Sequence, residues 1–318
     1  MYCSVYVDDI LYVLHKEKDE ISLHNSLKQH VDTKCLEPVT HYLGTDTIRS
    51  EDGSFMLRQE EKIKQMLDIC GMSECKPVST PMTVSFQQET NKIPCTNPDL
   101  YRHIMGKLQY LVKVTCPDIC NAVSFLSRKV ETPTEHDWQG VKRVLRYLKG
   151  TSKKGLVMSG QGKGGMECYV DADHASELTS RKSTTGIVIL LHGSVIDWCS
   201  RRQAVVAISS SEAEYVSLST TCNKLQWFEH LTQELCIEVK KPILVYEDNQ
   251  TCIRLAMSEA NTKRTKHISV RYHHIRECIQ QGFITLSYCN TNNMLANVMT
   301  KPICEEKYNR MVIKLGMY

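Results

Sequence analysis

The chain has 318 residues, of which 42% are hydrophobic and 24% charged, a composition typical of globular proteins. At roughly 100–200 residues per domain, this length predicts two to three domains. The net charge of +3 permits contact with polyanions but does not require it. No apolar run reaches the ~18–20 residues of a membrane helix, and no signal peptide opens the chain. We therefore expect an intracellular protein, cytoplasmic or nuclear, with no membrane partner.

The first 58 residues read as strands around one helix. Residues 2–14, "YCSVYVDDILYVL", are rich in valine, isoleucine and tyrosine, which predicts a hairpin with Asp8 and Asp9 at its turn. The spacing of apolar residues over 20–31 is helical. The turn "SEDGS" then separates two further strands within 39–59.

Residues 59–160 have mainly helical periodicity. A polar stretch with four prolines, residues 76–99, interrupts it and is expected to be a linker or extended loop. A Gly/Lys-rich stretch at about 150–165 then predicts a domain boundary. The predicted helices cover 59–72, 99–114, 118–130 and 136–150.

In residues 161–318 the pattern changes from mainly helical periodicity to strands mixed with helices. Three strands in a meander, followed by alternating strands and helices, predict an α/β fold with a mixed sheet and helices on its faces. Ser209 and Glu212 have the spacing of a capping box at the start of a long helix. The predicted elements are a strand over 166–173, a hairpin over 186–200 turning at His192-Gly193, a strand over 203–210, a helix over 211–235, a strand over 241–249, a helix over 266–282 and a strand over 283–290.

The 15 cysteines are an odd number and indicate reduced thiols rather than a disulfide framework. Cys116 with Cys120, and Cys70 with Cys75, come nearest to a zinc-ligand spacing, but neither pair fits it well. Buried free thiols are the favoured interpretation.

Three acids of the last domain follow apolar stretches where a sheet would present them to a crevice. Asp171 and Asp248 each end a predicted strand, and Glu214 lies near the start of the long helix. Carboxylates that converge repel one another unless a cation lies between them, and oxygen ligands suit Mg²⁺ or Mn²⁺. The alternative is that each acid is a turn or capping residue. If Glu212 serves the cap, Glu214 is left for chemistry.

Several longer motifs resemble those of a known protein family. The segments "YVDADHASELTSRKSTTGIVILLHGSVIDWCSRRQAVVAISSSEAEY", "EDNQTCIRL" and "RTKHISVRYHHIRE" resemble the ribonuclease H domain of Ty1/copia-type retrotransposon Pol polyproteins. The segments "YVDDIL", "HYLGTDTIRSEDG" and "VKRVLRYLKGT" resemble the end of the same family's reverse transcriptase and its connection to ribonuclease H. The resemblance implies a partial polymerase palm over 1–58, thumb or connection helices over 59–160, and a ribonuclease H-like domain with a five-stranded mixed sheet over 161–318.

The family's ribonuclease H cuts the RNA strand of RNA–DNA hybrids with four acids that hold two Mg²⁺ or Mn²⁺ ions. The resemblance assigns Asp171, Glu214 and Asp248 to three of these positions. The fourth position is Asn297, whose amide carries no charge, so a weaker second metal and impaired activity are expected. Glu247, beside Asp248, adds like-charge repulsion. The alternative is an inactive nucleic-acid-binding relic or a co-opted interaction protein.

The "YVDD" motif resembles the polymerase palm motif whose Asp8 and Asp9 lie beside catalytic metals. That chemistry also needs an earlier aspartate and the fingers, which in the family lie well upstream. We therefore expect Asp8 and Asp9 to be a remnant without polymerase activity, unless other Pol-derived chains supply the missing part. The palm hairpin is also expected to expose an edge prone to aggregation.

Basic side chains near the predicted site would hold a hybrid by its phosphates, without reading sequence. The alternative is that some of them are solvated surface charges. The candidates are Arg181, Lys182, Arg201, Arg202, Arg264 and Lys266.

Overall fold

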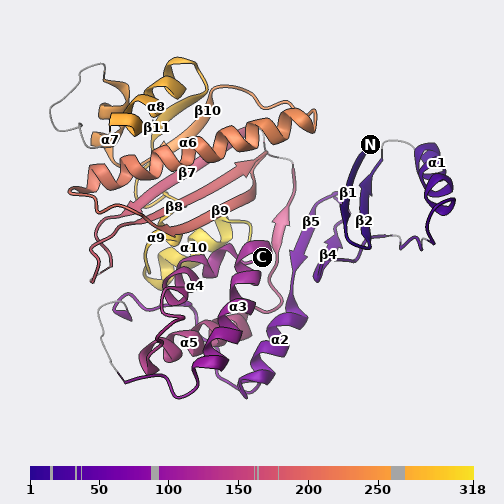
Figure 1. Cartoon of the computed structure of the whole chain (residues 1–318), viewed down its shortest axis with the longest axis horizontal. Helices are drawn as coiled ribbons and strands as arrows, with labels where there is room; N and C mark the ends of the chain where they lie inside the picture. Colours follow the sequence, from indigo (N-terminus) through magenta and orange to yellow (C-terminus); the bar gives the residue numbers. More distant parts are fainter. Residues whose placement is uncertain are drawn as a thin grey trace.

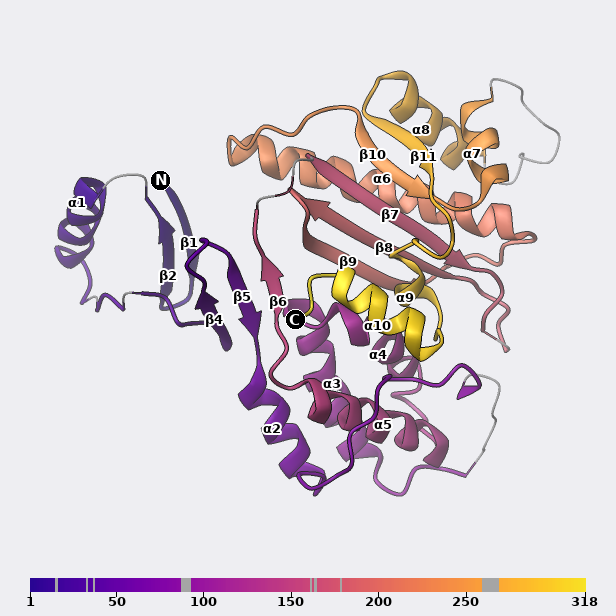
Figure 2. The same ribbon diagram turned by 180° about the vertical axis from the view of Figure 1, so that it is seen from behind.

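The computed structural model describes the chain except residues 15, 16, 33, 37, 87–92, 161, 163, 164, 178 and 259–268. Its strands form a two-stranded, a four-stranded and a five-stranded sheet. In both views the two-stranded sheet and the first helix lie at one end of the molecule, away from the five-stranded sheet (Figures 1 and 2). No helix in the described part of the chain is both long and apolar enough to cross a membrane.

The N-terminal hairpin has the predicted form. Strands β1 (Tyr2–Tyr6) and β2 (Asp9–Val13) are antiparallel, with Tyr6 opposite Asp9 at the turn. Helix α1 (Glu17–Lys28) follows. Before Thr45, no residue that the structure describes is fully buried. The hairpin exposes several large apolar side chains.

The four-stranded sheet joins segments that are far apart in the sequence. Strands β3 (His41–Tyr42), β4 (Thr45–Arg49) and β5 (Phe55–Arg58) are antiparallel neighbours around the predicted turn. Strand β6 (Leu156–Met158) pairs with β5 and was not predicted, because the Gly/Lys-rich stretch around it gives no strand signal. Leu156 also bridges to Met317, so the C-terminal end of the chain lies against this strand.

The predicted helices of the middle part are present. Thr134 and Asp137 form a full capping box at the start of the last helix, in which each side chain binds the other residue's backbone N–H. The linker packs against these helices, since Phe86 stacks on His136 with 4.1 Å between ring centroids. Cys116 and Cys120 are buried free thiols, as favoured from the sequence. The elements are α2 (Glu60–Ile69), α3 (Pro98–Val114), η2 (Pro117–Ile119), α4 (Cys120–Ser127) and α5 (Glu135–Thr151).

The five-stranded sheet is mixed, as predicted. The first three strands form an antiparallel meander, and β10 lies parallel to both β7 and β11. The order across the sheet is β11-β10-β7-β8-β9. The strands are β7 (Met166–Asp173), β8 (Thr184–Leu191), β9 (Ser194–Arg202), β10 (Ile243–Glu247) and β11 (Ile284–Tyr288).

Both faces of this sheet are covered. Along β8, Ile187 and Ile189 point into a core with the helices α6 (Ser210–Glu234), α7 (Gln250–Met257) and α8 (Ser269–Gln280). Val188 and Leu190 point the other way, into a core with α9 (Asn297–Thr300), α10 (Glu305–Lys314) and the middle helices. Because strand side chains alternate between faces, two covered faces explain the unbroken apolar run "GIVILL".

One predicted strand is wrong. Residues 203–209 form bends and loops rather than a strand, and Val205, Val206 and Ile208 are exposed. Gln203 is buried instead, and its amide donates to the carbonyl oxygen of Ala213 at 2.8 Å. This bond ties the end of β9 to the first turns of α6, so the chain turns away from the sheet and adds no strand to its edge.

The second core spans the predicted boundary near residue 160. It contains Leu108 and Leu145 from the middle helices together with Val298 and Met311 from the C-terminal part. Asn121 on α4 donates to the carbonyl oxygen of Met299 at 3.1 Å. The middle helices therefore support one face of the five-stranded sheet, and the division into three domains stays a prediction.

Candidate active site

Three carboxylates meet at one edge of the five-stranded sheet. Asp171 lies near the end of β7, Asp248 directly after β10, and Glu214 in the second turn of α6. One oxygen of each lies within 4.8 Å of the others. Strands β7 and β10 are parallel, so their C-terminal ends share this edge. The structure thus brings together the three acids singled out in the sequence.

The start of α6 separates the two glutamates. Ser209 accepts a hydrogen bond from the backbone N–H of Glu212, as the predicted capping box requires. The Glu212 carboxylate binds the backbone N–H of Ile208 at 2.8 Å, rather than that of Ser209. Glu212 is therefore used in the cap, while Glu214 is buried and turned toward the other acids.

Asp171 is held from the side of α9. The Thr300 hydroxyl donates to Oδ2 of Asp171, and the Lys301 amino group lies 3.8 Å from the same oxygen. Burial raises the pKa of Asp171, and the positive charge of Lys301 partly opposes this shift. Burial alone would lower the pKa of Lys301, but attraction to Asp171 and Asp173 outweighs it and the pKa is raised.

Asp248 and Asn297 are linked through one loop residue. Thr291 donates from its hydroxyl to Oδ2 of Asp248 at 2.7 Å. The carbonyl oxygen of Thr291 accepts from the Asn297 amide at 2.7 Å and from Lys307 at 2.8 Å. Asn297, to which the family resemblance assigned the role of a weak fourth ligand, is therefore oriented by the same loop that orients Asp248.

Three buried oxygens around this site have no hydrogen-bond partner in the described part of the chain. They are Oε2 of Glu214, Oε2 of Glu247 and Oδ1 of Asn297. Buried polar atoms are nearly always paired in folded proteins, so three orphaned acceptors at one site leave oxygens free to bind a cation. Hard oxygen donors of this kind are the ligands that Mg²⁺ and Mn²⁺ prefer.

The charges of the acids also bear on cation binding. Burial raises the pKa of Glu214 well above its usual range, with a further contribution from the negative charge of Glu247. Burial raises the pKa of Glu247 to about 8, although the backbone N–H of Asn249 stabilises its charged form. These acids repel one another when all are ionised, and a bound cation would remove that cost.

The predicted basic residues fall into two groups, one at the sheet edge and one outside the described residues. Arg202 pairs with Glu177 at 2.9 Å, and Arg181 and Lys182 belong to the turn that follows Glu177. Arg202 lies opposite Thr184 on the neighbouring strand, and Thr184 lies opposite Asp173. The predicted residues from Arg181 to Arg202 therefore lie at the sheet edge that carries Asp171. Arg264 and Lys266 lie outside the described residues.

The other sequence candidates form no comparable site. Asp8 and Asp9 lie on the exposed N-terminal hairpin, and neither belongs to any cluster of three metal-ligating side chains in the described part of the chain.

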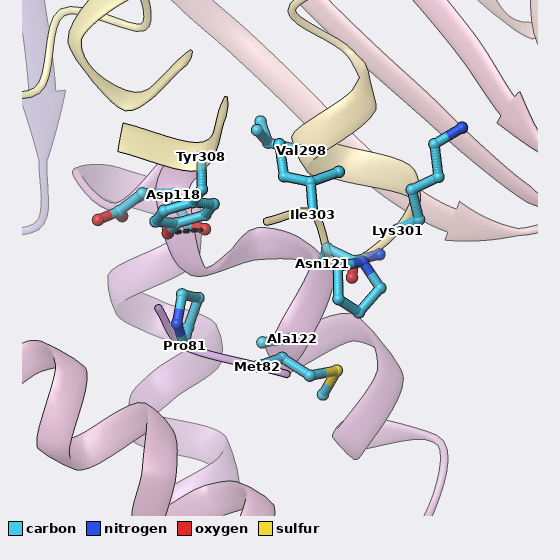
Figure 3. A pocket seen from close by; sticks show the side chains of 10 residues that line it. Pro81, Met82, Asp118, Asn121, Ala122, Val298, Lys301, Ile303 and Tyr308 are labelled. Carbon is cyan, nitrogen blue, oxygen red and sulfur yellow. Dashed lines mark hydrogen bonds between the residues drawn. The ribbon is translucent and has the colours of Figure 1, made fainter. Parts of the chain in front are cut away.

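A small cavity between α4 and the C-terminal segment, of about 10 Å³, has room for no more than one water molecule. In Figure 3 the Tyr308 hydroxyl bonds to Asp118 beside this cavity, whereas Lys301 extends away from them.

Sequence reasoning gave no role to Thr300, Lys301 or Asp173. Thr300 is the last residue of the short helix α9 and Lys301 follows it, and nothing local indicates that this helix lies against β7. Asp173 is two residues after Asp171 on the same face of β7, and burial raises its pKa. The alternation "DAD" was the one signal that could have indicated it.

Similarity to known proteins was found in sequence and in structure. No protein-family model matches the chain. The whole chain is 35% identical to 22% of the retrovirus-related Pol polyprotein from transposon RE1 of Arabidopsis thaliana. It is 34% identical, over 99% of its length, to 24% of the Pol polyprotein from transposon TNT 1-94 of Nicotiana tabacum. The chain thus spans about a quarter of the length of these curated relatives.

Two further likenesses were found. An uncharacterized mitochondrial protein of Arabidopsis thaliana is 36% identical over 71% of this chain and 94% of its own. Among solved structures, a ribonuclease H1 isolated from compost matches 47% of this chain and 99% of its own, with 15% identity and a TM-score of 0.34. Ribonuclease H1 of Halobacterium salinarum matches 43% of this chain and 95% of its own, at a TM-score of 0.33.

Proposed function

The chain belongs to the copia-type retrotransposon Pol polyproteins, and from that premise we propose that its five-stranded domain hydrolyses the RNA strand of RNA–DNA hybrids. The observation that carries the proposal is the meeting of Asp171, Glu214 and Asp248 within 4.8 Å. Divalent cations bound by these acids, Mg²⁺ or Mn²⁺, would activate water and stabilise the leaving oxygen of a phosphodiester.

The chain's own residues prepare the site for such a cation. Asp171 would be a ligand whose position is fixed by the Thr300 hydroxyl, on a strand that contacts both β10 and α9. Glu214 offers one orphaned oxygen from the side of α6, and Asn297 offers another from α9. Asn297 brings an oxygen without a charge, so a cation that it helps to hold would be bound more weakly than one held by carboxylates alone.

Substrate binding would use the sheet edge beyond the acids. Arg181, Lys182 and Arg201 lie at this edge, and Arg202 is already paired with Glu177. Phosphate contacts of this kind would position a duplex without selecting its sequence. Recognition of the RNA strand would depend on its 2′-hydroxyl groups.

A second function is favoured by Asn297. With one acid replaced by an amide, the site would keep its basic edge and lose part of its metal affinity, which describes an inactive nucleic-acid-binding relic. The two functions differ in one measurable respect, since the relic would bind a hybrid without cutting it.

The test is cleavage of an end-labelled RNA–DNA hybrid in Mg²⁺ or Mn²⁺. Asp171→Asn should abolish cleavage while leaving the melting temperature nearly unchanged, because the amide is isosteric. Asp99→Asn is the matched control, since Asp99 is exposed and its one ion pair among the described residues is with Arg102. Hybrid binding with no cleavage by the wild type in either metal would favour the relic and reject the nuclease.

A further inference from the structure

A second cluster of metal-ligating side chains lies far from the acids, beside the N-terminal hairpin. Glu20 and His24 come from α1, and Cys35 from the segment that follows it. One ligand atom of each lies within 4.8 Å of the others. Glu20 and His24 are four residues apart, so they share one face of the helix. Among the described residues, these three and the site acids are the clusters of this kind.

Tyr12 of β2 lies at the centre of the cluster. Its hydroxyl is 3.0 Å from an oxygen of Glu20, 3.0 Å from Nε2 of His24 and 3.7 Å from the sulfur of Cys35. Its ring also meets the His24 ring edge to face, with centroids 5.9 Å apart. The cluster therefore joins three segments: the hairpin, α1 and the stretch after α1.

Apolar packing does little to hold these segments together. In the part of the chain before Thr45 that the structure describes, no residue is fully buried. Ile21 on α1 is 62% exposed and Leu36 is 70% exposed. Small units without a hydrophobic core commonly depend on a bound metal or a disulfide. Cys35 is a free thiol, so a disulfide does not take this role.

We propose that Glu20, His24 and Cys35 bind a structural Zn²⁺ ion that clamps α1 and the following segment onto the N-terminal hairpin. Imidazole, thiolate and carboxylate are the zinc ligands of proteins, whereas Mg²⁺ and Mn²⁺ prefer oxygen alone. On binding, the Cys35 thiol releases its proton to solvent and the thiolate ligates the metal. The Tyr12 hydroxyl lies close enough to hydrogen-bond to a ligand of the ion.

The competing explanation is that Tyr12 is only a hydrogen-bond hub for the three side chains. The two explanations differ in what zinc does to the wild-type chain. If the cluster is a zinc clamp, added Zn²⁺ slows tryptic cleavage after Lys28 and Lys34, and a chelator restores it. If the cluster is a hub, Zn²⁺ leaves cleavage at these lysines unchanged and the proposal is overturned.

Cobalt identifies the ligands. Co²⁺ bound by a cysteine thiolate gives a sulfur-to-metal charge-transfer band, which is measured on the full chain with excess Mg²⁺ present to occupy the acidic site. Cys35→Ser should remove this band, and His24→Ala should lower the zinc content by one ion per chain. Tyr12→Phe should retain the zinc, because it removes the hub and leaves the three ligands.

The controls are exposed residues of the same kinds, His30→Ala and Cys236→Ser, which should leave the band and the zinc content as in the wild type. Asp171→Asn should also leave the band unchanged, so the result does not depend on the nuclease proposal. Equal zinc content in the wild type, Cys35→Ser and His24→Ala would overturn the clamp.

Discussion

Gly186 lies directly opposite Asp171 in the antiparallel ladder between β7 and β8, and its missing side chain makes room for Thr300. A Cβ at this position would lie 2.5 Å from Cγ2 of Thr300 and 2.8 Å from the carbonyl oxygen of Ala296. Helix α9 can therefore approach the sheet only because residue 186 is glycine. This approach brings the Thr300 hydroxyl onto Asp171 and Asn297 to the same edge.

Gly186→Ala should accordingly displace α9 from the sheet. Overpacking of this kind typically costs about 1–3 kcal/mol of stability, and a displacement of about 1 Å at a catalytic site can cost roughly 100-fold in rate. We expect a lower melting temperature together with loss of hybrid cleavage. The control is Gly106→Ala on α3, where an added Cβ meets nothing within 4 Å. Unchanged cleavage by Gly186→Ala would show that α9 does not position the site.

The stability of the metal-free chain should depend on pH through Glu247. Burial raises the pKa of this carboxyl from 4.5 to about 8, so the folded chain holds the proton more tightly than the unfolded chain does. The contribution of Glu247 to the free energy of unfolding should therefore be most favourable below pH 4.5. It should become less favourable as the pH rises toward about 8. The expected loss is on the order of a few kcal/mol.

Thermal melts in a chelator across this pH range measure the effect. Glu247→Gln should flatten the curve, because a glutamine oxygen can still accept from the backbone N–H of Asn249 and carries no charge. Mg²⁺ should restore stability mainly at the alkaline end, where the acids are ionised. The prediction would be contradicted if the melting temperature of the wild type rose between pH 4.5 and about 8 and followed that of Glu247→Gln.

Lys301 should stabilise the site when no metal is bound. Its amino group lies 3.8 Å from Asp171, and within the described part of the chain it is the largest positive influence on that carboxyl. Lys301→Met should lower the melting temperature in a chelator, and saturating Mg²⁺ should reduce the difference from the wild type. Lys314→Met is the control, since Lys314 is exposed and its one hydrogen bond within the described part of the chain is to Asn293. Equal losses with and without Mg²⁺ would mean that Lys301 acts through packing.

The N-terminal hairpin should promote self-association. Val5 and Tyr6 are 66% and 60% exposed on β1, which pairs with β2 alone among the described strands. An exposed apolar edge strand is a template for pairing with another chain, and a lysine on it prevents this. Val5→Lys should lower the concentration-dependent mass measured by light scattering. Val84→Lys, on an exposed valine outside the hairpin, should leave the mass unchanged.

The acids could be found from sequence because each lies at a point fixed by local pattern. Asp171 and Asp248 follow apolar strands, and the cap at Ser209 separates the role of Glu212 from that of Glu214. The resemblance to the retrotransposon family then selected these acids among many others. Asn297 was found only through that resemblance, because no local pattern marks it.

The features that were missed depend on contacts between distant segments. Strand β6 exists because β5, about a hundred residues earlier, offers it a partner. Residues 203–209 have an apolar pattern typical of a strand, yet the buried side chain of Gln203 turns them toward α6. Thr300 and Lys301 reach Asp171 because Gly186 admits α9. Periodicity along the chain carries no information about any of these pairings.

The central claim is that Asp171, Glu214 and Asp248 together bind a hard divalent cation, and Mn²⁺ binding tests it most directly. The concentration of free Mn²⁺ can be followed by electron paramagnetic resonance in a titration of the metal-free chain at about pH 8. The wild type should bind Mn²⁺, Asp171→Asn should lose that binding, and Asn297→Asp should bind more tightly or take up a second ion. Identical isotherms for the wild type and Asp171→Asn would contradict the claim.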